Sequence, residues 1–185
     1  MPNIGRLCAL IVTAGILILP AHRLWAAGSP STVSQTVPRC GNTQLSLQAT
    51  QSQGAAGHIA ILFRIHKTWG NGCSLQGYPG AELLDRQFHT LPTHVSRGHG
   101  YIVSGSPSQL QVTLDSSHDA YFTLEYSDVQ TGNGACPRVP YLMVTPPNDR
   151  LPIVTYTHGG RSQAYVTPCG GNLVVSPVRA SAAFR

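Results

Sequence analysis

The spacing of the cysteines constrains the fold of this chain more than any other feature of its sequence. Cys8 lies in an N-terminal apolar segment, and the other four are Cys40, Cys73, Cys136 and Cys169. An even set of cysteines in an exported chain indicates disulfides, here two. Three pairings are possible. The first two cysteines and the last two are each 33 positions apart, which favours Cys40–Cys73 and Cys136–Cys169. The short Cys-x2-Cys or Cys-x2-His steps of a zinc site are absent from the sequence.

The N-terminus has the pattern of a secretory signal peptide. Arg6 precedes an almost wholly apolar run at 7–19, Pro20 breaks this run, and small residues follow at 26–28. Residues 1–28 are therefore expected to be a signal, cut after residue 26, 27 or 28. An uncleaved anchor is disfavoured because the 13-residue run is shorter than the roughly 20 residues that span a bilayer. Cys8 would leave with the signal, and the mature chain is expected to have no stable transmembrane span.

The remaining length suits a single domain. Residues 29–39, rich in Ser, Thr, Val, Gln and Pro, are expected to form a flexible mature N-terminus, residues 40–179 the domain, and residues 180–185 a tail. Two of the 12 basic residues, Arg6 and Arg23, lie in the signal, so ten remain against 7 acids and the net charge is +3. These charges are scattered singly, so a nucleic-acid partner is not expected.

Short apolar runs between turn signals predict many β-strands and no long helix. Several runs alternate apolar and polar residues, which is typical of half-buried strands, and the run at 59–65 is apolar on both faces, as in a central strand. Strands are expected at 45–49, 59–65, 81–84, 101–103, 110–114, 120–126, 141–144, 153–156 and 173–178. This series predicts an all-β fold, an immunoglobulin-like antiparallel β-sandwich with two disulfides, with a small barrel as the alternative.

Residues 86–100, with three histidines and Gly98 and Gly100, are expected to form a polar surface loop, where a sandwich usually carries binding function. Trp69 precedes a Gly-Asn-Gly turn and is either an exposed stacking anchor or, as we favour, a cap over the core. Tyr78 could likewise dock a ligand, but a turn tyrosine that packs on the core is favoured.

Several segments together resemble the actinobacterial secreted family called domain of unknown function 4232. The most specific is Cys-Ser-Leu-Gln-Gly-Tyr-Pro-Gly at 73–80, and the others are at 54–58, 83–85, 136, 144–147, 168–169 and 175–178. The chain departs from the family at 115–119, where Asp-Ser-Ser-His-Asp replaces a Pro-Gly turn. The resemblance implies an envelope or extracellular β domain, and it brings no catalytic residue.

The sequence gives only weak indications of a catalytic site or a metal site. Seven histidines follow the predicted signal, at 58, 66, 89, 94, 99, 118 and 158, but they are scattered and have no metal-ligand spacing. Histidine and serine with Asp119 could form a triad in the fold, yet no Gly-x-Ser-x-Gly elbow is present and no cysteine is left free. No catalytic residue, metal ligand or cofactor is therefore assigned.

These observations predict an exported, non-catalytic binding or interaction module of the bacterial cell envelope or extracellular space. Its expected partner is an envelope or extracellular protein or a glycan. Two alternatives stay open: a secreted hydrolase acting on cell-wall or host material, and a metal-binding envelope protein. The hydrolase requires a serine and a histidine within hydrogen-bond reach in a pocket.

Overall fold

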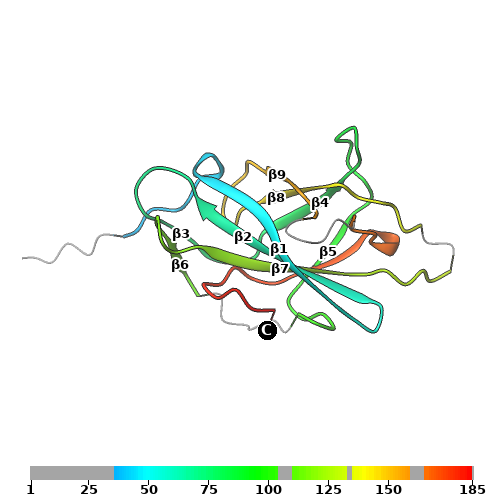
Figure 1. Ribbon diagram of the computed structural model, residues 1–185. Helices are drawn as coiled ribbons and strands as arrows, with labels where there is room; N and C mark the ends of the chain where they lie inside the picture. The colour runs from blue at the N-terminus through cyan, green and yellow to red at the C-terminus, as the bar shows by residue number, and fades with distance from the viewer. Residues whose placement is uncertain (1–35, 104–109, 133–134, 159–164, 185) are drawn as a thin grey trace, which may run out of the picture. The chain divides into compact units, whose positions relative to one another are not determined.

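The computed structural model describes residues 36–103, 110–132, 135–158 and 165–184, which form ten strands and two short 3-10 turns (Figure 1). The predicted signal peptide at 1–28, including Cys8, lies outside these ranges, as does most of the predicted flexible segment at 29–39. In the described parts of the chain, no helix has the length and apolar character needed to cross a membrane.

The largest sheet has five strands in the order β1-β2-β7-β10-β5. All its pairs are antiparallel except β5 with β10, which are parallel. Its strands are β1 (Leu45–Ala55), β2 (His58–Lys67), β5 (His94–Arg97), β7 (Ala120–Ser127) and β10 (Asn172–Val175). The long hairpin of β1 and β2 turns at Ala56 and Gly57, which both have positive φ (50° and 79°), as a two-residue hairpin turn requires.

Two smaller antiparallel sheets complete the fold. One has three strands in the order β4-β8-β9, namely β4 (Gly80–Leu84), β8 (Tyr141–Thr145) and β9 (Ile153–Tyr156). The other pairs β3 (Cys73–Leu75) with β6 (Val112–Leu114). The 3-10 turns are η1 (Asn42–Gln44), just before β1, and η2 (Cys169–Gly171), just before β10.

One apolar core unites strands of all three sheets. Ile61, Phe63 and Phe122 contribute from the large sheet, and the rings of Phe63 and Phe122 stack with centroids 5.1 Å apart. Leu83 and Leu142 contribute from the β4-β8-β9 sheet, and both are essentially unexposed. Burying side chains of this size stabilises the fold by about 1.5–3 kcal/mol each. The alternation along these strands is thus explained by one shared interior.

The structure confirms the all-β class, the antiparallel sheets and most of the predicted strands. β2 lies between β1 and β7, as its two apolar faces predicted. The prediction of a strand at 101–103 is wrong. The backbone N–H groups of these residues donate to the Glu125 carboxylate instead of to a neighbouring strand. The loop predicted at 86–100 contains β5, and β3 was missed.

Candidate functional site

Both disulfides join the cysteines that the spacing favoured, Cys40 with Cys73 and Cys136 with Cys169. The first bond links the segment before β1 to β3, where Cys40 N–H also donates to the carbonyl oxygen of Ser74 at 3.0 Å. The second links the segment before β8 to η2. Disulfides persist in oxidising compartments, so the pair indicates an extracytoplasmic environment.

The two aromatic residues singled out in the sequence have different surroundings. Tyr78 packs against the core, as predicted. Trp69 is 59% exposed, and its indole N–H donates to the carbonyl oxygen of Thr43 at 2.8 Å. The prediction that Trp69 covers the core is therefore wrong, because this hydrogen bond holds the ring against the turn at η1.

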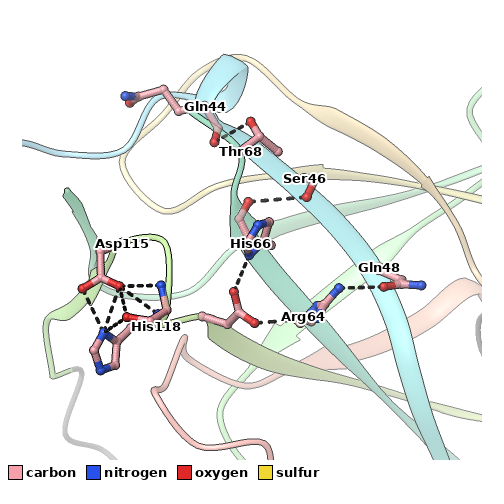
Figure 2. Close-up of polar contacts among 10 residues, drawn as sticks. Gln44, Ser46, Gln48, Arg64, His66, Thr68, Asp115 and His118 are labelled. Atoms are coloured by element: carbon pink, nitrogen blue, oxygen red, sulfur yellow. Dashed lines mark hydrogen bonds and ion pairs between the residues drawn. The ribbon is translucent and has the colours of Figure 1, made fainter. Parts of the chain in front are cut away.

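The loop before β7 brings a serine, a histidine and an aspartate together, as the hydrolase hypothesis requires. His118 Nδ1 lies 3.2 Å from Ser117 Oγ and 2.8 Å from Asp115 Oδ2 (Figure 2). A catalytic triad uses both ring nitrogens, because one accepts the serine proton while the other donates to the carboxylate. Here both partners face the same nitrogen, and Ser117 Oγ donates to Asp115 Oδ1 at 2.8 Å. These three residues therefore do not have triad geometry.

This loop cluster is a turn held by its own aspartate. Asp115 Oδ1 accepts the backbone N–H groups of Ser117 at 2.7 Å and of His118 at 2.9 Å. The Ser117 backbone hydrogen bond and the His118 and Ser117 side chains hold the pKa of Asp115 well below its usual range. Ser117 and His118 line a depression of about 280 Å³, but Ser117 Oγ and His118 Nδ1 are already used within the turn.

A second polar cluster lies beside this turn on β2 (Figure 2). His66 Nδ1 is 2.7 Å from Asp119 Oδ1, and Arg64 Nη1 is 3.8 Å from Asp119 Oδ2. Arg64 also donates to Gln48 Oε1 on β1 at 3.0 Å. His66 and Arg64 thus hold Asp119, and among the described contacts no serine side chain reaches Asp119 or the His66 ring.

Other histidine side chains of the fold are also paired with carboxylates. Two further pairs, His58 with Glu125 at 3.0 Å and His89 with Asp85 at 3.3 Å, again join Nδ1 to an acidic oxygen. Such pairing can orient the other ring nitrogen towards a metal. Within the described ranges, however, no group of three histidine, cysteine or acidic side chains is close enough to hold an ion.

A different cleft, of about 250 Å³, has polar groups that are not yet used. Its apolar floor comes from the inner face of the large sheet, with Ile59, Ile61 and Tyr126, and its far wall from Thr157, His158 and residues 165–167. Two polar side chains stand at its rim, Ser52 and Asp128. Among the contacts of the described residues, neither of these side chains makes a hydrogen bond or an ion pair.

A β-bulge in β1 turns Ser52 towards the cleft. The register with β2 shifts between Ala49, which faces Phe63, and Gln51, which faces Leu62. Ser52 consequently pairs with Ile61, whose side chain points into the core. Bulges often re-aim side chains in this way next to functional sites.

The buried phenol at the base of the cleft has a perturbed pKa. Tyr126 is 6% exposed, and burial raises its pKa, with a smaller increase from the charge of Asp128. Hydrogen bonds with Thr167 act in the opposite direction. The cleft therefore has a neutral hydroxyl at its base and a carboxylate at its rim.

A row of aromatic side chains leads away from the cleft. His158 and Tyr165 belong to both, with perpendicular rings whose centroids are 5.9 Å apart. The row continues from His158 to Tyr156 at 5.4 Å, from Tyr156 to Tyr141 at 5.2 Å, and from Tyr141 to Phe88 at 4.4 Å. Tyr156 and Phe88 are 57% and 56% exposed. Sequence analysis considered His158 only as one scattered histidine and missed the other members of the cleft and row.

The comparisons with known proteins give one match. The model of the family described as domain of unknown function 4232 matches residues 40–179. No curated protein and no solved structure matches the chain. Because the family model covers most of the chain, this protein belongs to the family called domain of unknown function 4232.

Proposed function

We propose that this protein is an exported, non-catalytic binding module of the cell envelope or extracellular space, built on an immunoglobulin-like β-sandwich. The disulfides and the core shared by the sheets support this architecture. The segment at 1–28, with its signal-peptide pattern, supports export.

The observation that carries the proposal is the cleft with two polar side chains, Ser52 and Asp128, that have no partner among the described residues. A hydroxyl and a carboxylate at one rim can donate to and accept from a ligand without giving up any hydrogen bond of the described fold. The cleft also has an apolar floor, and ligand sites usually combine such a floor with a few convergent polar groups. The Ser117 cluster lacks triad geometry, and no observation favours the hydrolase or metal-binding alternatives over binding in the cleft.

The proposal is tested by ligand retention with a matched pair of proteins. Wild-type protein and Asp128→Ala, each immobilised, are exposed to envelope extract, and the retained lipids, glycans and proteins are identified. We expect at least one component to be retained by wild type and lost by Asp128→Ala. Identical retention by both proteins would contradict a binding function of this cleft.

A further inference from the structure

We infer that the cleft and the aromatic row together form a binding site for a neutral polysaccharide, with one sugar ring in the cleft and neighbouring units along the row. This inference rests on the proposed function, since it names the ligand of the same cleft. It goes further because it assigns a ligand class and a second, extended part of the site.

The cleft has the size and polarity for a single sugar ring. Its volume of about 250 Å³ is below the roughly 300–1,000 Å³ that is usual for drug-sized ligands. Sugar hydroxyls both donate and accept, and the rim offers both functions. Asp128 provides acceptor oxygens, while the Ser52 hydroxyl can both donate and accept. The apolar floor of the cleft offers a surface for the apolar C–H groups of a pyranose.

The carboxylate of Asp128 disfavours an anionic ligand beside it. No lysine or arginine is among the described residues that line it, whereas Asp128 contributes a carboxylate. A phosphate or a uronic acid would place its negative charge beside this carboxylate, which is unfavourable at short range. The Arg86 guanidinium lies over the Tyr165 ring at 5.7 Å, in a cation–π contact.

The row gives the site the length that a polymer needs. Successive ring centroids from Tyr165 to Phe88 are 4.4–5.9 Å apart, so neighbouring rings are in contact without a gap. Three of the four neighbouring pairs are tilted or perpendicular, and the exposed rings of Tyr156 and Phe88 offer surface to a ligand. Tyrosine and histidine rings present an apolar surface with a polar atom at its edge, which suits a ligand with C–H faces and hydroxyl edges.

The far end of the row is held in a strained conformation. Phe88 has a φ of 63°, which is rare for a residue other than glycine. Its N–H donates to the carbonyl oxygen of Asp85, whose carboxylate accepts the N–H groups of Gln87 and His89 at 2.8 Å and 2.9 Å. This turn places an exposed phenyl ring on Tyr141. Strained residues of this kind cluster at ligand-binding sites, which supports a binding role for this end of the row.

A cationic ligand is the main competitor, because aromatic rings and a carboxylate can also surround a quaternary ammonium group. Such a ligand does not need the hydroxyl of Ser52, and it does not need a row that extends beyond the cleft. The neutral polysaccharide uses all of these features, so it is the occupant that we propose.

The test is calorimetric titration of the full-length, disulfide-bonded protein with neutral hexasaccharides of glucose, mannose, galactose and N-acetylglucosamine. We expect at least one to bind, and Tyr156→Ala to weaken it about tenfold by removing an exposed ring. Asp128→Ala should weaken it at least tenfold, and Asp128→Asn less, because the amide keeps one acceptor oxygen. Tyr101→Ala is the matched control, since it removes a ring that is 64% exposed and stacked on His58, outside the row.

Each other outcome overturns the inference. If no hexasaccharide binds, or if Tyr156→Ala and Tyr101→Ala weaken binding equally, the site does not bind a neutral polysaccharide. If tetramethylammonium binds in an Asp128-dependent way and no sugar does, the cleft takes a cation. If wild type retains a protein or lipid that Asp128→Ala loses while all sugars fail, the inference falls and the proposed function stands. If retention also shows no difference, both fall.

Discussion

Two acidic residues three positions apart, Glu125 in β7 and Asp128 just after it, have opposite surroundings. Glu125 is 1% exposed, and its carboxylate accepts the backbone N–H groups of Tyr101, Ile102 and Val103 at 2.7–2.9 Å and contacts His58 at 3.0 Å. Asp128 lies at the cleft rim, and its side chain makes no hydrogen bond within the described parts of the chain. The number of partners therefore separates a carboxylate that holds the fold together from one that is available to a ligand.

Removing the buried carboxylate should have the largest effect on stability. Glu125→Ala would leave the N–H groups of Ile102 and Val103 buried without an acceptor, at a cost of about 1–3 kcal/mol each. We expect the free energy of unfolding to fall by about 3–5 kcal/mol in urea titrations. Glu82→Ala, on the partly exposed β4, is the control and should change it by less than about 0.5 kcal/mol. If both variants lose the same free energy of unfolding, the Glu125 carboxylate does not hold the fold together.

Removing each disulfide in turn tests whether ligand binding depends on the local structure of the cleft or on the stability of the whole domain. Removing either bond, by Cys40→Ser with Cys73→Ser or by Cys136→Ser with Cys169→Ser, should cost about 3–4 kcal/mol, because both enclose loops of the same size. Cys169 follows the cleft-wall residues closely in sequence, so only the second pair of substitutions should also weaken sugar binding. Melting temperatures and calorimetric titrations of both variants test this. Equal loss of affinity would mean that the cleft depends on global stability alone.

The apolar–polar pattern of the sequence predicted the strands in which apolar and polar residues alternate. It failed where contacts with residues far away in the sequence determine the structure. β5 has four exposed residues, so its sequence carries no alternation that could identify it. Residues 101–103 look like a strand, but a carboxylate more than twenty positions away binds their N–H groups. The cleft was not predictable because the bulge that turns Ser52 inward lies in a run of polar residues. Only the register with β2 reveals it.

The His66–Asp119 pair should have a smaller effect than Glu125, because His66 is 40% exposed. Exposed ion pairs contribute about 0.2–1 kcal/mol. We expect Asp119→Asn to lower the free energy of unfolding by at most about 1 kcal/mol, and His66→Gln to remove most of that difference in a double-mutant cycle. A zero coupling energy in urea titrations would mean that the contact contributes nothing to stability.

Acid should weaken the fold slightly through the two exposed turns. The backbone N–H of His89 is the main cause that lowers the pKa of Asp85, and that of Ser117 the main cause for Asp115. A lowered pKa in the folded state means that these carboxylates stabilise the fold above the unfolded value of 3.8. The contribution is lost as pH falls through the lower, folded values. Urea midpoints measured between about pH 2 and pH 6 should fall less steeply for Asp85→Asn combined with Asp115→Asn than for wild type. Identical slopes would contradict this assignment.

Asp128 should have the smallest effect on stability, and this prediction tests the comparison with Glu125 most directly. Since no hydrogen bond of the described fold uses its side chain, Asp128→Ala should change the free energy of unfolding by less than about 0.5 kcal/mol while ligand retention is lost. The same substitution at Glu125 is expected to do the reverse, because it destabilises the fold without removing a group from the cleft. If Asp128→Ala instead unfolds the protein as readily as Glu125→Ala, its carboxylate has a structural partner. Its position at the rim would then no longer support a ligand.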